Sequence, residues 1–158
     1  MPNTPDFDLQ AAHSYFSAHC FNQAWDLIEK QDRSPEEDQD MLRLSFAALW
    51  HWTQRTDYIP KNASVGYWQL ARIYALLGQA ENARQYGQLC LQASQQPGVA
   101  PFYLGYAYEA LARAEALAQD WQKAAAYKQD AMQAAAEVSD EQDRQVLLDD
   151  LATIQLSQ

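Results

Sequence analysis

The sequence predicts an all-helical protein, and three observations support this prediction. Alanine, leucine, glutamine and glutamate fill the segments between turns, a composition that favours helix. Only five glycines and six prolines occur, and the prolines, together with Gly78 and Gly98, fall at the boundaries of these segments. No segment shows the sustained alternation of apolar and polar residues that indicates a half-buried strand. A length of 158 residues is typical of one domain, so we expect a single helical domain over residues 1–158.

Turn and capping residues divide the chain into about eight expected helices. In "SPEE", Ser34 would cap a helix, Pro35 would be its first residue, and Glu37 would complete a capping box. Pro60 and the segment "QQPGVAP" mark further breaks, and Gly78 fits a left-handed helix end. Because the connections are short, successive helices should pack as stacked antiparallel pairs. The expected helices cover residues 6–19, 22–31, 35–55, 63–77, 80–95, 101–118, 121–137 and 140–156.

Two expected helix pairs resemble each other at an offset of 41 residues, from Ala83 to Ala124. The aligned positions are aromatic, leucine or small in both copies: Tyr67 with Tyr108, Leu70 with Leu111, Ala71 with Ala112, and Tyr86 with Tyr127. Each copy consists of a long helix, a tight turn and a second helix. A period in this range is typical of helical solenoids.

The stretch "GYWQLARIYALLGQAENARQYGQLCLQASQQPG" resembles one tetratricopeptide repeat (TPR). The resemblance is carried by its ordered aromatic, small and turn positions: Tyr67, Leu70, Ala71, Tyr74, Gly78, Ala83, Tyr86, Cys90 and Pro97. It is closest over residues 63–97 and partial over 100–137, where Glu115 and Gln119 align with Tyr74 and Gly78. With "HWTQ" and "PFYLGYAYEALARA", the chain also resembles a group of bacterial TPR-like proteins. The resemblance implies a right-handed α-solenoid with a concave groove that binds a protein or peptide.

Candidate binding residues are the polar and aromatic side chains that lie off the packing faces of the helices 35–55, 63–77 and 101–118. Helical spacing assigns Trp52, Tyr67 and Tyr74 to packing. The candidates that remain are Trp50, His51, Gln54, Trp68, Arg72, Tyr106, Glu109 and Arg113. Tryptophan, tyrosine and arginine dominate binding hot spots, so these residues could line one groove. The same residues could instead form a polar interface between helix pairs, in which an arginine pairs with Glu109.

Composition narrows the classes of partner. The chain has 21 acidic and 11 basic residues, and a formal net charge of −10 disfavours nucleic acid and anionic membranes. We find no motif for a phosphate loop, a metal site or a cofactor, and we expect a cytoplasmic, non-enzymatic interaction module. The alternative is a small-molecule-binding or catalytic pocket around His51, Arg72 and Glu109.

The last expected helix, 140–156, has a narrow apolar stripe formed by Val146, Leu147, Leu151 and Ile154. A solenoid needs a terminal helix with a polar outer face, and this segment fits that role. The same stripe could form a homodimer interface. We expect a monomer with this segment as a capping helix.

Overall fold

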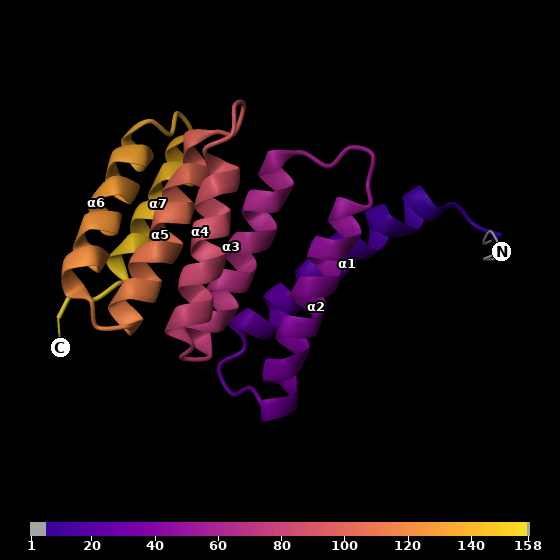
Figure 1. The fold of residues 1–158 in the computed structure, drawn as a ribbon, viewed down its shortest axis with the longest axis horizontal. Helices are drawn as coiled ribbons and strands as arrows, with labels where there is room; N and C mark the ends of the chain where they lie inside the picture. Colours follow the sequence, from indigo (N-terminus) through magenta and orange to yellow (C-terminus); the bar gives the residue numbers. More distant parts are fainter. Residues whose placement is uncertain (1–5, 158) are drawn as a thin grey trace.

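The computed structural model describes residues 6–157, and within them the chain forms seven α-helices and no strand. The predicted all-helical class is therefore confirmed (Figure 1). The helices are α1 (Leu9–Glu29), α2 (Pro35–Thr53), α3 (Pro60–Leu76), α4 (Ala80–Ser94), α5 (Pro101–Leu117), α6 (Trp121–Ala136) and α7 (Glu141–Ala152).

The predicted break near residues 20–21 is wrong, because the chain forms one continuous helix there, α1. No glycine or proline interrupts this segment. The Phe21 ring packs against Trp52 of α2, with 5.4 Å between ring centroids, and the Phe21 carbonyl accepts a hydrogen bond of 3.0 Å from Gln69 of α3. The second half of α1 thus contacts both α2 and α3. Because it contacts two helices, its apolar residues shift from one side of the helix to another although the helix itself is continuous.

The predicted capping box at the start of α2 is confirmed. The Ser34 hydroxyl accepts a hydrogen bond of 3.2 Å from the Glu37 main-chain N–H, and the Glu37 carboxylate accepts one of 2.9 Å from the Ser34 main-chain N–H. Pro35 is the first residue of the helix, where its missing N–H costs nothing. Local sequence alone is enough to fix this boundary.

Adjacent helices pack in pairs, as predicted. The most extensive contacts join α1 with α2, α3 with α4, and α5 with α6. In addition, α3 contacts α5, and α5 contacts α7. The helices α3, α5 and α7 therefore lie next to one another, and α1 reaches α3 through the Phe21–Gln69 hydrogen bond and the Trp25 and Trp68 rings. The helices α2, α4 and α6 are the second members of their pairs (Figure 1).

The pairs α3–α4 and α5–α6 have boundaries that differ by the same 41 residues as their sequences: Pro60 and Pro101 begin the first helices, and Ala80 and Trp121 begin the second. Gly78 and Gln119 occupy equivalent positions in the two turns. Both have left-handed backbone angles, with φ of 73° and 62°. The two turns thus have the same local conformation although only one of them has glycine at that position.

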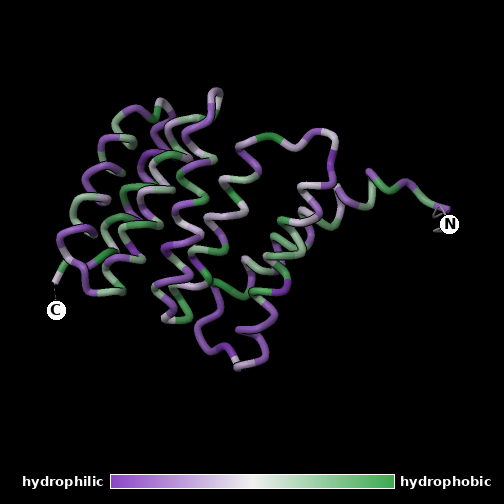
Figure 2. The backbone as a smooth tube through the Cα atoms, in the orientation of Figure 1, coloured by the Kyte–Doolittle hydropathy of each residue, from purple (hydrophilic) through white to green (hydrophobic). Residues whose placement is uncertain are grey.

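The interior is built from small and aliphatic side chains, and Figure 2 shows hydrophobic residues recurring along the packed helices. Ala112, Ala131 and Ala135 pack with Leu147, Leu151 and Ile154, so α7 covers the last helix pair. Three glycines, Gly66, Gly87 and Gly105, allow close helix approach. A Cβ atom at Gly87 would lie 2.8 Å from Leu111 Cδ2, and one at Gly105 would overlap Leu147 Cδ2.

Candidate functional site

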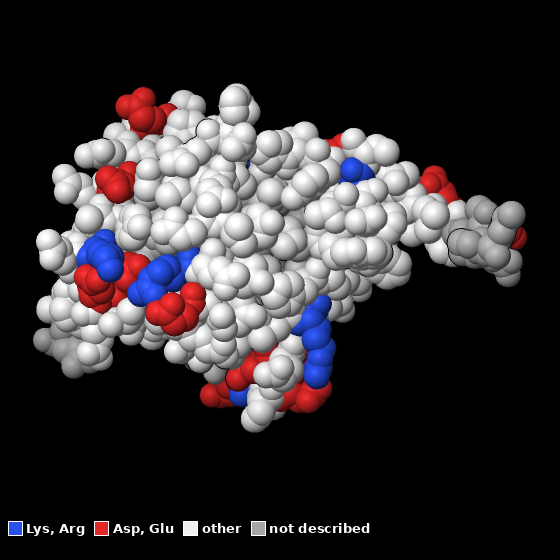
Figure 3. Space-filling view, viewed as in Figure 1, with Lys and Arg blue, Asp and Glu red and all other residues white. Residues whose placement is uncertain are grey.

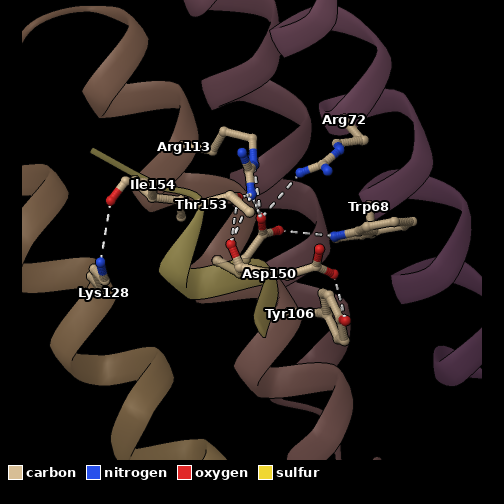
Figure 4. Close-up of polar contacts among 9 residues, drawn as sticks. Trp68, Arg72, Tyr106, Arg113, Lys128, Asp150, Thr153 and Ile154 are labelled. Carbon is tan, nitrogen blue, oxygen red and sulfur yellow. Dashed lines mark hydrogen bonds and ion pairs between the residues drawn. The ribbon is translucent and has the colours of Figure 1, made fainter. Parts of the chain in front are cut away.

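The carboxylate of Glu109, on α5, lies at the centre of a hydrogen-bond network that joins α3 and α5 (Figure 4). Glu109 is fully buried. Its carboxylate accepts hydrogen bonds from the Trp68 indole N–H at 3.2 Å, from Arg72 Nη1 at 3.3 Å, and from Arg113 Nε and Nη2 at 2.8 and 2.5 Å. A buried carboxylate is stable only when it is paired in this way.

Arg113 and Tyr106 extend the network to α7. Arg113 Nη2 donates to the Asp150 main-chain oxygen at 3.2 Å and to Thr153 Oγ1 at 2.9 Å. The Tyr106 hydroxyl donates to Asp150 Oδ2 at 2.7 Å. Burial raises the pKa of Tyr106 far above its usual value, and the hydrogen bond to Asp150 raises it further. The phenol therefore stays protonated and acts as a donor (Figure 4).

An aromatic pocket of about 400 Å³ lies beside this network. Its volume is within the range of ligand-binding sites. All of its lining residues belong to odd-numbered helices. They are Phe21, Asn22 and Trp25 of α1, Ser64, Val65 and Trp68 of α3, Phe102, Tyr103 and Tyr106 of α5, and Val146 and Asp150 of α7. We call this site the aromatic pocket.

The polar edges of three rings in the aromatic pocket already have partners inside the protein. The Trp25 indole N–H donates to Glu29 Oε1 at 2.9 Å, the Trp68 indole N–H donates to Glu109, and the Tyr106 hydroxyl donates to Asp150. The Trp68 ring centroid lies 5.5 Å from that of Trp25 and 5.4 Å from that of Tyr106. The pocket wall therefore consists largely of ring surface.

A second hollow of about 400 Å³ lies next to the aromatic pocket along α3 and α5. Arg72 and Arg113 line it, together with Trp121 at the start of α6 and residues 153–155 and 157 after α7. We call it the arginine hollow. Two guanidinium groups share the single buried carboxylate of Glu109, so the network has a net positive charge on this side.

Charged side chains are sparse over much of the molecular face shown in Figure 3. They gather near the loop between α1 and α2 and near the lower turns of the later helices. Exposed ion pairs include Lys30–Glu37, beside the loop between α1 and α2, and Arg84–Glu81, in the first turn of α4.

The structure brings five of the eight predicted site residues together: Trp68, Arg72, Tyr106, Glu109 and Arg113. The other three, Trp50, His51 and Gln54, lie at the end of α2 and contact α1. The Trp50 ring lies 5.5 Å from that of His13, His51 Nδ1 lies 2.8 Å from His13 Nδ1, and the Gln54 carbonyl accepts from Gln10.

We expected a groove formed by α2, α3 and α5, and this prediction is wrong for α2. The aromatic pocket is lined by α1 in place of α2, together with α3 and α5, and α7 lines it as well. The alternative pocket around His51, Arg72 and Glu109 is not formed, since His51 contacts α1 and Glu109 contacts α3 and α5. Burial lowers the pKa of His51, and the neighbouring His13 lowers it further.

Nine of the residues that line the aromatic pocket were not among the predicted site residues. For some of these nine, the spacing of residues in the sequence indicates a shared helix face with predicted site residues. Val65, Trp68 and Arg72 follow one face of α3, and Phe102, Tyr106, Glu109 and Arg113 follow one face of α5, with helical spacing. Extending both patterns to the first turns of α3 and α5 would have added Val65 and Phe102 to the predicted site residues. The contributions of α1 and α7 depend on tertiary packing and have no such local pattern.

Comparison of the chain with protein-family models, with curated proteins and with solved structures found no match. Within residues 6–157, no three histidine, cysteine, aspartate or glutamate side chains come together as a metal site requires. In the same range, no helix is both long enough and apolar enough to cross a bilayer. The aromatic pocket and the network beside it are thus the features on which a function can be based.

Proposed function

We propose that this protein is a non-enzymatic, TPR-like interaction module that binds an extended peptide segment of a partner protein. The binding site is a concave groove along the first helices of the stacked pairs. One observation carries the proposal: the aromatic pocket is lined only by α1, α3, α5 and α7. Stacked helical repeats use concave surfaces of this kind to bind partners.

The composition of the aromatic pocket supports binding of a partner. Tryptophan and tyrosine are enriched where binding free energy is concentrated, because a rigid ring buries a large area at little entropic cost. The pocket has two tryptophans and two tyrosines, and the ring edges of Trp25, Trp68 and Tyr106 have partners inside the protein. A ligand can therefore contact the ring faces without breaking an internal hydrogen bond.

The extent of the surface favours a peptide as the ligand. Val65, Trp68 and Arg72 continue along α3 from the aromatic pocket to the arginine hollow, and α5 runs beside them with Tyr106 and Arg113. The two hollows together accommodate more than one side chain. An extended segment with side chains in both hollows matches this surface better than a compact small molecule.

Val146 provides the sharpest test, because it lines the pocket and is 48% exposed. We expect Val146→Lys to place a charge in the pocket while leaving the free energy of unfolding nearly unchanged. Ala152→Lys is the matched control, since Ala152 is exposed on the same helix and lines neither hollow. Trp68→Ala is less informative, because it also removes a hydrogen bond to Glu109.

The experiment selects phage-displayed random peptides on the wild-type protein and measures their affinity for both variants. We expect selected peptides to lose at least tenfold in affinity for Val146→Lys and to keep it for Ala152→Lys, as for removal of a central interface contact. Circular dichroism should show equal helicity in all three proteins. If no peptide distinguishes the two lysine variants, the groove is not the binding site and the proposal fails.

A further inference from the structure

We infer that the aromatic pocket binds the cationic side chain of a lysine or arginine in a basic peptide. This inference rests on the proposed function, since it names the chemistry of the segment that the groove takes up. The alkyl part of the side chain packs on the tryptophan rings, and its charge lies at Asp150.

Among the described residues that line the pocket, Asp150 is the one carboxylic acid, and none is a lysine or arginine. Its Oδ2 atom accepts the hydrogen bond from Tyr106. Its Oδ1 atom has no hydrogen-bond partner within residues 6–157. This oxygen is free to accept a charge-assisted hydrogen bond from a ligand.

The aromatic rings favour a cation at the same place. Trp25, Trp68, Phe102, Tyr103 and Tyr106 surround the pocket, and the face of an aromatic ring attracts a cation. One lining ring, Tyr103, already has the Lys61 ammonium 6.0 Å from its centroid, so we assign the ligand cation to the other rings, on the side of Asp150. The formal net charge of −10 attracts basic segments over longer distances.

The neighbouring arginines do not cancel this preference. Arg72 and Arg113 both bind the buried Glu109 carboxylate, and both line the arginine hollow, not the aromatic pocket. An acidic side chain in the aromatic pocket would meet Asp150 and be repelled. An apolar side chain would remove water from Asp150 Oδ1 without replacing its hydrogen bond, which carries a desolvation cost.

The test uses three peptides with blocked ends, in which the middle residue of an alanine pentapeptide is lysine, norleucine or glutamate. Norleucine keeps the alkyl chain of lysine and lacks the ammonium. Binding is followed by the NMR signals of the Trp25 and Trp68 indole N–H groups. We expect the lysine peptide to bind about five- to tenfold more tightly than the norleucine peptide, as for one cation–π contact with one ion pair. The glutamate peptide should not shift these signals.

Asp150→Asn and Asp149→Asn form a matched pair of variants. Each changes the net charge equally, and the amide oxygen introduced by Asp150→Asn would still accept the hydrogen bond from the Tyr106 hydroxyl. Asp149 is exposed, accepts from Gln145 at 2.7 Å, and does not line the pocket. We expect Asp150→Asn to remove most of the preference for lysine over norleucine, and Asp149→Asn to preserve it.

Three results would overturn the inference: equal binding of the lysine and norleucine peptides, no shift with the lysine peptide, or equal loss in both asparagine variants. The last would show general attraction to an acidic protein. If phage-selected peptides lose affinity for Val146→Lys, the proposed peptide-binding groove remains supported even when the inference about the cation fails. If those peptides ignore Val146→Lys, the proposed function fails as well, so the two failures can be distinguished.

Discussion

The helix pairs α3–α4 and α5–α6 have equivalent positions 41 residues apart. At positions of the first kind the two pairs have the same residue, and at positions of the second kind their residues differ. Leu70 and Leu111 are identical and fully buried, and so are Ala83 and Ala124. Trp68 is instead equivalent to Glu109, Tyr74 is equivalent to Glu115, and Gly78 is equivalent to Gln119. The first kind fills the interior of each pair, where both copies need the same shape.

The second kind includes residues through which the two pairs contact each other. The Trp68 indole N–H donates to Glu109, its own equivalent in the next pair. Arg84 of α4 donates to Glu115 with bonds of 2.6 and 2.8 Å. At this position the two equivalent residues of α3 and α5 meet, so identical residues would place tryptophan on tryptophan or carboxylate on carboxylate. Divergence between the copies makes donor–acceptor pairs possible.

The largest effect is expected for Glu109→Ala, which would leave two arginines and an indole N–H without their shared acceptor. We expect the free energy of unfolding to fall by about 3 kcal/mol, since removing one partner of a buried ion pair is costly. Urea denaturation followed by circular dichroism measures the change. A loss below about 1 kcal/mol would show that the contact between the pairs does not depend on this carboxylate.

Glu115→Ala and Glu81→Ala compare two carboxylates that bind the same arginine, Arg84. The Glu115 side chain is 3% exposed and that of Glu81 is 89% exposed. We expect Glu115→Ala to cost about 1–2 kcal/mol and Glu81→Ala less than about 0.5 kcal/mol in urea denaturation. Similar costs for both variants would contradict the importance of the buried contact between the pairs.

The two turns allow a smaller, opposite pair of changes. Gln119 has a φ of 62°, a conformation in which glycine avoids the strain of a Cβ atom. We expect Gln119→Gly to stabilise the protein by about 0.5 kcal/mol and Gly78→Ala to destabilise it by about 1 kcal/mol.

Thermal unfolding measures both changes. Ala118→Gly is the control, because Ala118 has an ordinary right-handed conformation and glycine there should only destabilise. If Gln119→Gly also lowers the melting temperature, the side chain of Gln119 has a role that its backbone angle does not reveal.

The smallest effect concerns α1–α2, which lies outside the 41-residue equivalence. Burial and His13 lower the pKa of His51 below its ordinary value near 6.5, so the folded state takes up a proton less readily than the unfolded state. The free energy of unfolding should therefore be constant above about pH 7 and fall as the pH drops through 6.5. In addition, the 2.8 Å contact between His13 and His51 needs one ring nitrogen without a proton.

Denaturation at a series of pH values tests this, with His51→Phe as the comparison variant. The variant should show a flatter profile between about pH 7 and pH 5. An unchanged slope in the variant would mean that other groups cause the dependence.

Local patterns predicted much of the fold. The helix class, the pairing of neighbours and the capping box at Ser34 all depend on residues close together in sequence, and the structure confirms them. The continuity of α1 at Cys20 and Phe21 could not be predicted, because the apolar face of α1 shifts to contact both α2 and α3.

Part of the site could be predicted for the same reason. Trp68, Arg72 and the α5 residues share helical faces that the sequence shows directly. Trp25 and Asp150 reach the aromatic pocket from α1 and α7, and only the tertiary arrangement brings them there. Whether Glu109 binds a ligand or pairs internally also depends on that arrangement, and in the structure its four hydrogen bonds are all internal.

The close approach at Gly87 and Gly105 has a consequence for how the sequence can change over time. Each glycine leaves space for one leucine on another helix: Leu111 for Gly87 and Leu147 for Gly105. A glycine-to-alanine change therefore forces its leucine to shift, and a smaller residue in place of that leucine removes the clash. The two substitutions are therefore epistatic: alanine in place of the glycine fits only after the leucine has been replaced by a smaller residue. Among related chains, covariation at these positions would mark the packing of this stack more clearly than conservation of either residue.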